Sequence, residues 1–286
     1  MIKNKNSYEF INSSGGLATG MNSIHSKNDT LWIGWPGIAS DNLNIKTKGE
    51  LNKFLDEKKF KPVQLNKKEI KDFYYGLSNK SLWPLFHYFI EYSIFDKDNW
   101  DSYKRVNNKF AQCIIENYNE GDLIWIHDYH LMLCPKIIRD LIPNSIIGFF
   151  LHIPFPSFEI FRIFPWRKEL LSGILGSDLV GFHTYDYQRH FLSSVKRILL
   201  TNVKLNRVSV GSRKILVNTF PMGIDFEKFN NGAKKYLTKN SFKKPQFSVK
   251  NILTIDRLDY TKGVVQRIKA FEMFLDNYPQ YIEKVK

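Results

Sequence analysis

Short runs of apolar residues alternate along the chain with longer segments in which apolar residues recur at helical spacing. The short runs have the continuous apolar character of strands that are buried on both faces of a sheet. They are residues 31–33, 123–126, 146–151, 179–182, 215–219 and 251–255. The helical segments are residues 103–117, 131–141, 186–200 and 264–275. Strands that alternate with helices in this way predict a parallel sheet in an α/β fold.

The composition changes between residues 230 and 250, where the chain is polar, basic and poor in large apolar residues. We interpret 230–250 as a linker or exposed excursion that follows a first domain over 1–229. The remaining segment, 251–286, reads as a strand, a loop and a helix, which is the opening βα unit of a second α/β domain. With only about 40 residues it is too short to close an independent core, so we expect this domain to be incomplete.

The overall composition is that of a folded protein. Of the 286 residues, 43% are hydrophobic and 24% are charged, which excludes wholesale disorder. The chain has two cysteines, Cys113 and Cys134, too few for a disulfide framework, and we expect both to be reduced. No uninterrupted apolar stretch is long enough for a membrane span, and the N-terminus lacks the apolar core of a secretory signal. These features predict a cytoplasmic protein without a membrane partner.

The charge balance is strongly basic, with 42 Lys and Arg against 28 Asp and Glu, for a formal net charge of +14. Such an excess is typical of proteins with anionic partners, including nucleic acid and phosphorylated small molecules. Solvated lysines scattered over the surface are the alternative. The basic residues are dispersed and no DNA- or RNA-binding motif is present, so we do not expect a nucleic-acid partner.

Polar residues directly follow two of the predicted strands. The tetrapeptide HDYH, residues 127–130, comes after one strand, and His152 ends the next. Ligands in open α/β sheets bind beyond the carboxyl ends of the strands, so Asp128 is a candidate for orienting substrate hydroxyls or for proton transfer. A buried structural network of histidine and aspartate is the alternative. The two histidines of HDYH lack a third ligand nearby, so no metal is expected. At a third strand end, His183 and Asp186 lie in GFHTYDYQRH.

Two loops carry residue types that suit phosphate groups. In SSGGLATG, Gly15 and Gly16 precede helix-forming residues, and backbone N–H groups in such a loop can bind an anion or a sugar hydroxyl. An ordinary glycine turn is the alternative there. In DRLDYTKG, Arg257 and Lys262 flank a turn between a strand and a helix. Arginine offers a planar fork and lysine a compact charge to a diphosphate, with solvated surface charges as the alternative.

Aromatic residues gather in FYYGLSNKSLWPLFHY, residues 73–88. Tyr74 and Trp83 have the flat apolar faces that stack on pyranose rings. An aromatic core cluster is the alternative.

Taken together, these segments resemble the trehalose-6-phosphate synthases, retaining glycosyltransferases of family 20 with two facing Rossmann-like domains, the GT-B arrangement. The matching stretches, in the order of the family, are SSGGLATG, WIGWPG, LSNKSLWPLFHY, HDYHLMLCP, FFLHIPFPS, LVGFHTYDYQRHF, FPMGIDFEKF and RLDYTKG. Each stretch alone is weak, but the ordered set covers nearly the whole chain. It is most similar to the fungal-type branch.

The resemblance implies transfer of glucose from UDP-glucose to glucose 6-phosphate with retention, giving α,α-trehalose 6-phosphate and UDP. On the donor side it implies that Arg257 and Lys262 bind the diphosphate and that Gly15 and Gly16 close over the donor. His152 is implied to face the transferred glucose. Because the two cations can neutralise the leaving diphosphate, neither a metal nor another cofactor is expected.

On the acceptor side, the resemblance implies that Asp128 handles sugar hydroxyls and that Tyr74 and Trp83 line the acceptor site. The partners are then the two small-molecule substrates, with a homo-oligomer or a trehalose synthase complex as possible assemblies.

Two departures from the family pattern bear on the fold. Family members begin with a strand that ends in an N-R-L-P-type motif, whereas MIKNKNSYEF is similar to the segment just after it. We therefore expect a nearly complete N-terminal domain that lacks its first strand and the arginine implied to contact acceptor phosphate. The family's later basic residue and acidic stretch have no counterpart after RLDYTKG.

Two functions from different classes follow from this pattern. One is an active synthase. The other is a catalytically inactive paralogue that binds a sugar phosphate or regulates a trehalose synthase complex.

Overall fold

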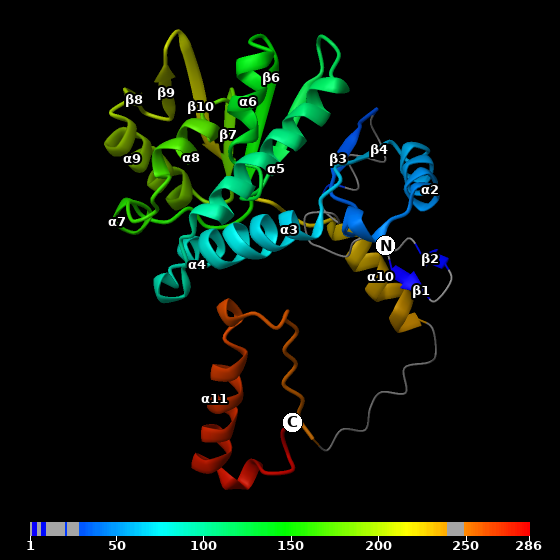
Figure 1. Cartoon of the computed structure of the whole chain (residues 1–286). Helices are drawn as coiled ribbons and strands as arrows, with labels where there is room; N and C mark the ends of the chain where they lie inside the picture. Colours follow the sequence, from blue (N-terminus) through cyan, green and yellow to red (C-terminus); the bar gives the residue numbers. More distant parts are fainter. Residues whose placement is uncertain (1, 5–6, 10–20, 22–28, 239–248) are drawn as a thin grey trace. The chain divides into compact units, whose positions relative to one another are not determined.

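The computed structural model describes residues 2–4, 7–9, 21, 29–238 and 249–286 (Figure 1). Gly15 and Gly16 lie outside the described residues, as does part of the expected linker, 239–248. Contacts between residues divide the chain into two compact units, Met1–Met222 and Gly223–Lys286.

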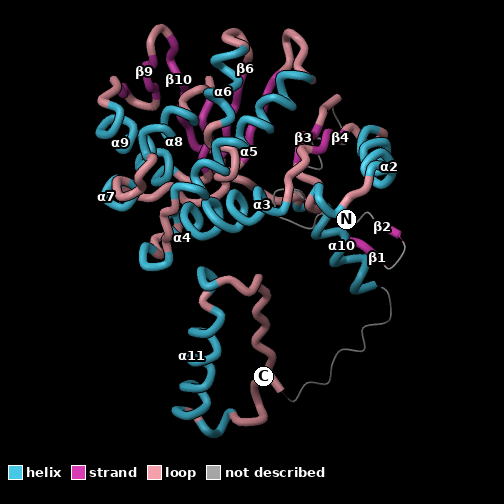
Figure 2. Tube along the Cα trace, in the orientation of Figure 1, coloured by secondary structure: helices cyan, strands magenta, loops and turns pink. Residues whose placement is uncertain are grey.

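A six-stranded sheet is the centre of the first unit (Figures 1 and 2). Its strands, in spatial order, are β5 (Leu123–His127), β6 (Ile146–Leu151), β7 (Leu179–Phe182), β10 (Arg213–Thr219), β9 (Arg207–Val210) and β8 (Val203–Lys204). The first four run parallel to one another. Strand β9 pairs with β10 in antiparallel fashion, and β8 pairs with β9 in the same way. The predicted α/β fold with a parallel sheet is therefore confirmed.

Helices cover one face of this sheet (Figure 1). They are α5 (Lys97–Glu116), α6 (Cys134–Leu141), α7 (Phe158–Phe161), α8 (Arg167–Ile174) and α9 (Tyr185–Leu199). On the covered face, Ile126, Phe149, Val180 and Val217 lie side by side in register across the four parallel strands. All four side chains are buried in one hydrophobic core. The expected burial on both faces is wrong for β5 and for the start of β6, because Leu123, Trp125 and Ile146 point away from this core and are exposed.

Smaller elements precede the sheet in the chain. They are β1 (Ile2–Asn4), β2 (Ser7–Glu9), β3 (Trp32–Gly34), η1 (Ser40–Asn42), α2 (Ile45–Asp56), β4 (Phe60–Pro62), α3 (Lys67–Glu69), η2 (Ile70–Leu82), α4 (Trp83–Phe86) and η3 (Ile90–Tyr92). Strand β1 pairs with β2 in antiparallel fashion, and β3 pairs with β4 in parallel. A capping box at Asn66 and Glu69 starts α3, which continues directly into η2.

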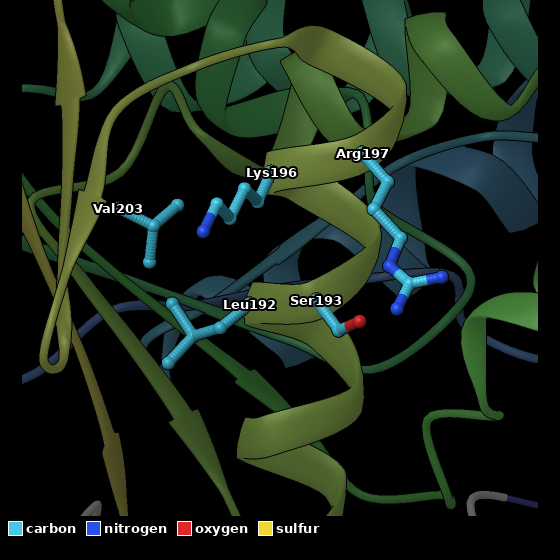
Figure 3. Close-up of a pocket in the computed structure, with 5 residues that line it drawn as sticks. All are labelled: Leu192, Ser193, Lys196, Arg197 and Val203. Atoms are coloured by element: carbon cyan, nitrogen blue, oxygen red, sulfur yellow. The ribbon is translucent and has the colours of Figure 1, made fainter.

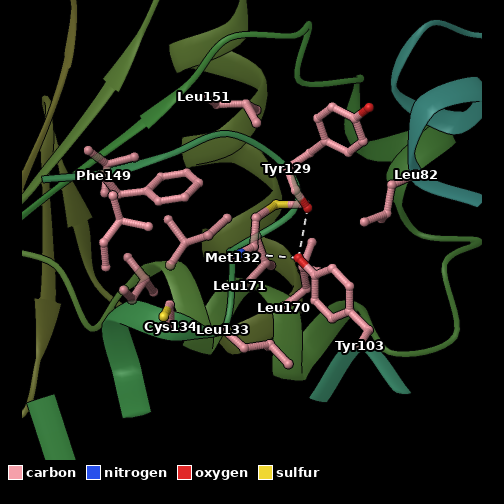
Figure 4. Close-up of a cluster of buried hydrophobic side chains, with 14 of the residues drawn as sticks. Leu82, Tyr103, Tyr129, Met132, Leu133, Cys134, Phe149, Leu151, Leu170 and Leu171 are labelled. Carbon is pink, nitrogen blue, oxygen red and sulfur yellow. Dashed lines mark hydrogen bonds between the residues drawn. The ribbon is translucent and has the colours of Figure 1, made fainter. Parts of the chain in front are cut away.

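Two side chains of α5 fix the loop that follows β5. The hydroxyl of Tyr103 donates a hydrogen bond to the carbonyl oxygen of Tyr129 over 2.7 Å and accepts one from the N–H of Met132 over 3.1 Å (Figure 4). The amide of Asn107 donates to the carbonyl oxygen of His130 and accepts from the N–H of Leu133. Both side chains are buried, so these bonds are shielded from water and hold the loop in one conformation.

The second unit contains α10 (Phe226–Thr238), η4 (Tyr260–Lys262), α11 (Val264–Asn277) and η5 (Pro279–Tyr281). The segment expected to be a linker or excursion over 230–250 therefore begins inside a helix. The carboxylate of Asp225 accepts a hydrogen bond from the N–H of Lys228, which caps the first turn of α10. Polar, lysine-rich composition fits an exposed helix as well as a linker, so composition alone does not separate the two.

The strand predicted over 251–255 is wrong in the structure. These residues are exposed and form no strand, although the N–H of Ile252 donates to the carbonyl oxygen of Lys286. An isolated bridge between Lys250 and Val285 is the nearest strand-like pairing. A parallel strand is stable only beside hydrogen-bonded neighbours, and the described part of this unit offers no sheet for the apolar run to join.

Candidate active site

The carboxyl ends of the neighbouring strands β5 and β6 bring Asp128 and His152 together. The carboxylate oxygen Oδ1 of Asp128 accepts a hydrogen bond from the backbone N–H of His152 over 3.3 Å. The backbone N–H of Asp128 in turn donates to the carbonyl oxygen of Phe150 over 2.8 Å. The two residues predicted from separate motifs therefore form one site at the edge where ligands of open α/β sheets bind.

Asp128 has an uncommon backbone conformation and a perturbed carboxyl group. Its φ angle is 71°, in the left-handed region that non-glycine residues adopt mainly when their surroundings impose it. Burial raises the pKa of its carboxyl group from 3.8 to about 6, against the opposing effect of hydrogen bonds from the N–H groups of Tyr129 and His152. A carboxylate with a pKa near neutrality is suited to exchange protons with a substrate hydroxyl.

Three histidines meet beside this carboxylate, one from each of the strand ends of β5, β6 and β7. Nδ1 of His127 lies 3.0 Å from Nε2 of His152, and the ring of His183 contacts that of His152 edge-on at 5.4 Å between centroids. Burial lowers the pKa of His127 to about 4. Burial lowers the pKa of His152 to about 3, helped by repulsion from His127 and His183. The imidazole rings of His127 and His152 are therefore neutral at physiological pH.

The helix η2 has π-type geometry, which decides how Tyr74 is oriented relative to Trp83, the first residue of α4. At its end, the N–H of Trp83 donates to the carbonyl oxygen of Ser78, five residues earlier. Tyr74 and Trp83 are nine residues apart, which in an α-helix is about two and a half turns and would place them on opposite faces. The wider π turn places them on the same face, together with Asn79.

The contacts of this face confirm the shared orientation. The ring of Tyr74 stacks on that of His130 with 5.3 Å between centroids and 11° between planes. The hydroxyl of Tyr129 donates to Oδ1 of Asn79 over 3.1 Å, and the ring of Trp83 lies 5.7 Å from that of Tyr129. The two predicted aromatic residues thus flank the same HDYH loop that carries Asp128.

In the second unit, Arg257 and Lys262 lie on an exposed loop that leads into α11. The carboxylate of Asp259 accepts hydrogen bonds from the N–H and the hydroxyl of Thr261, which gives the loop a defined turn. Gly263 has a φ of 61°, and α11 begins at the next residue. The turn and the helix predicted after it are present in this unit, whereas the strand predicted before the turn is not formed.

Comparison with known proteins bears on what this arrangement does. The sequence profile of glycosyltransferase family 20 matches residues 2–286. A UDP-forming α,α-trehalose-phosphate synthase from Pichia angusta is 46% identical over 98% of this chain. The chain belongs to glycosyltransferase family 20. It spans about 60% of the length of the Pichia relative.

Solved structures of a trehalose-phosphate synthase and of part of a trehalose-6-phosphate phosphatase share the fold. A UDP-forming α,α-trehalose-phosphate synthase from Burkholderia xenovorans, in complex with glucose-6-phosphate, superposes with a TM-score of 0.83 and 29% identity over 96% of this chain and 62% of its own. The N-terminal domain of a trehalose-6-phosphate phosphatase from Candida albicans gives 0.81 and 34% over 97% of this chain and 60% of its own. This likeness confirms the GT-B-type α/β fold class.

Sequence reasoning assigned no role to Asn79 or Tyr129, and it did not place His127 against His152. Tyr129 and His127 lie inside the HDYH motif, and Asn79 lies inside the LSNKSLW stretch, so the family 20 motifs are the signal that marks them. Their contacts depend on the π geometry of η2 and on strand register, which residue spacing does not reveal.

The described residues contain no group of three or more histidine, cysteine, aspartate or glutamate side chains placed to hold a metal ion. An open hollow of about 520 Å³ lies along α9, lined by Leu192, Ser193, Lys196, Arg197 and Val203 (Figure 3). None of the residues predicted for the family 20 site lines it. The strand-end cluster of Asp128, His152 and the π-helix aromatics is therefore the candidate active site.

Proposed function

We propose that the protein transfers glucose from UDP-glucose to glucose 6-phosphate with retention, giving α,α-trehalose 6-phosphate and UDP. The observation that carries this proposal is the joining of Asp128 and His152 at two strand ends beside Tyr74 and Trp83. The names of the relatives, which are UDP-forming trehalose-phosphate synthases, support the same chemistry.

The acceptor side of the site has parts that suit a sugar phosphate. The rings of Tyr74 and Trp83 offer apolar faces to a pyranose, and the carboxylate of Asp128 can accept hydrogen bonds from its hydroxyls. Because the pKa of Asp128 is about 6, the carboxylate is mostly ionised at physiological pH and binds hydroxyls as an acceptor.

The reacting carbon gains positive charge as the UDP leaves, and His152 suits this step. With a pKa of about 3, its ring is neutral and does not repel that charge, while it can still hydrogen-bond a hydroxyl of the transferred glucose. The acceptor hydroxyl attacks on the side from which the diphosphate leaves, and the diphosphate takes its proton. Catalysis then rests on positioning and on stabilisation of the leaving group.

We assign stabilisation of the leaving diphosphate to Arg257 and Lys262, through a bidentate guanidinium and a compact ammonium group. Gly15 and Gly16 are assigned to the loop over the donor on the basis of the family motif. No metal or other cofactor is required in this scheme, because the two cations supply the compensating charge.

A catalytically inactive binding protein is a second candidate. In this case the chain binds a sugar phosphate, alone or within a trehalose synthase complex, without turning it over. The names of the synthase relatives support the first candidate rather than this one.

The cellular setting is also part of the proposal. No helix in the described part of the chain has the length and apolar character to cross a membrane. Cys113 and Cys134 are free thiols in the structure. We propose a cytoplasmic enzyme that works as a homo-oligomer or in a trehalose synthase complex.

The test is UDP release by the purified protein, supplied with UDP-glucose and glucose 6-phosphate. We expect turnover, with both anomeric centres of the product in the α configuration, and a large loss in Asp128→Asn. Lys136→Ala, which removes an exposed lysine paired with Asp140, is the matched control. Calorimetric binding of glucose 6-phosphate without UDP release would instead support the binding protein.

A further inference from the structure

We propose that His127 is a positioning residue that orients the ring of His152. Its Nδ1 atom accepts a hydrogen bond from Nε2–H of His152, which leaves Nδ1 of His152 as an acceptor for a substrate hydroxyl. The identity of that hydroxyl, on the transferred glucose, rests on the proposed function.

The geometry of the pair supports a direct hydrogen bond. Nδ1 of His127 and Nε2 of His152 are 3.0 Å apart, a normal length for a hydrogen bond between nitrogens. His127 is the last residue of β5 and lies opposite Phe150 in the sheet register. The partner ring thus comes from a rigid strand, which is the kind of support that holds a functional side chain in one geometry.

Two other rings pack against the ring of His152, and in the described contacts neither forms a hydrogen bond to it. The ring of Phe150 lies 4.6 Å from that of His152, and that of His183 lies 5.4 Å away. Ring packing limits the tilt of an imidazole but does not distinguish its two nitrogens. The bond to His127 is therefore the contact that decides which nitrogen of His152 faces the site.

The protonation state follows from the chemistry of two neutral imidazoles, because one ring must donate and the other must accept. If His152 donates from Nε2, both rings carry their proton on Nε2. If His127 donates from Nδ1, both rings carry it on Nδ1. Neutral imidazole side chains favour a proton on Nε2, so the first arrangement is the more stable. The lowered pKa values of both rings support the neutral state that this argument requires.

The consequence for function is that the nitrogen of His152 that faces the substrate is a hydrogen-bond acceptor. Its Nδ1 presents a lone pair, so the group that binds there must donate a hydrogen bond, as a sugar hydroxyl does. A ring flip of His152 would present a carbon–hydrogen edge or reverse the pattern of donor and acceptor. His127 therefore acts on the substrate through His152 and need not touch it.

Nitrogen-15 NMR of the histidine-labelled full-length protein tests the hydrogen bond directly. We expect Nε2 of His152 to resonate as a protonated nitrogen, with Nδ1 of both His127 and His152 as unprotonated nitrogens. His127→Phe should abolish the single tautomer of His152, whereas His127→Asn, whose side-chain oxygen can replace Nδ1 as the acceptor, should restore it. His183→Phe is the control, since it replaces a neighbouring imidazole by an apolar ring without removing the acceptor.

Kinetics provide the functional readout. We expect His127→Phe to lower kcat by about 10- to 100-fold through misplacement of His152, with a smaller change in KM for the acceptor, and His127→Asn to recover most of the loss. A protonated Nδ1 in His127, or an unchanged His152 tautomer in His127→Phe, would overturn the proposal. If the wild type shows no transfer but the NMR result holds, the proposed function fails while the positioning by His127 stands.

Discussion

The carboxylate of Asp128 accepts a hydrogen bond from the backbone N–H of His152, which ties together the ends of two neighbouring parallel strands. This position is unfavourable for Asp128 in two ways. Its φ of 71° lies in the left-handed region, and burial raises the pKa of its carboxyl group to about 6. Unfavourable conformation and desolvation at one residue are typical of sites that are shaped for function rather than for stability.

Asp128→Asn should stabilise the fold in a pH-dependent way. The raised pKa means that the folded state prefers the protonated carboxyl group, so this favourable contribution is present below the usual value of 3.8 and is lost as the pH rises through about 6. Asparagine stays neutral, tolerates the left-handed region and offers the same acceptor oxygen to His152. We expect the variant to be more stable by on the order of 1–3 kcal/mol near pH 8.

Urea denaturation of both proteins between about pH 4 and pH 8 measures this difference. The gain should shrink towards the acid end, while transfer activity is lost across the range. A gain that is independent of pH, or a destabilised variant near pH 8, would contradict the assignment of a desolvated carboxylate to Asp128.

The same substitution at two glycines should have opposite effects. A Cβ atom at buried Gly176 would overlap the backbone of Pro135 and Lys136, so Gly176→Ala forces α6 away and should destabilise the fold by about 1–3 kcal/mol. Gly49 lies in the exposed helix α2 with open space around it, and Gly49→Ala should stabilise by about 0.5–1 kcal/mol. Thermal unfolding checks both, and equal shifts would refute the packing of α6 described here.

Replacement of Arg257 or Lys262 by alanine in the full-length protein should weaken use of UDP-glucose without loss of the fold. Both side chains are exposed, and each is assigned to the leaving diphosphate. We expect kcat/KM for the donor to fall by about 10²- to 10³-fold in each variant. Lys269→Ala, an exposed lysine on α11, is the control for loss of one positive charge. Kinetics like those of the control in both variants would remove the assignment.

How far the sequence predicts the fold depends on what each pattern encodes. The runs at 123–126, 146–151 and 179–182 predict β5, β6 and β7 within one residue, because the strand residues that face the core must be apolar. The run at 251–255, which includes Asn251 and Thr254, forms no strand, since strand formation also needs a partner that local composition does not encode.

In the candidate site, too, some features follow from the local sequence and others depend on how the elements pair. Asp128 and His152 are predictable because the carboxyl ends of parallel strands share one edge of a sheet. Their hydrogen bond, the pairing of His127 with His152 and the common face of Tyr74 and Trp83 depend on register and on the π geometry of η2. The roles of Arg257 and Lys262 stay predictions.

A crystal structure of the full-length protein with UDP and glucose 6-phosphate tests the central claim most directly. We expect the acceptor sugar to lie against Tyr74 and Trp83, within hydrogen-bond reach of Asp128, and the diphosphate to contact Arg257 and Lys262. Binding of both ligands away from the ends of β5 and β6, or a diphosphate that contacts neither cation, would contradict it.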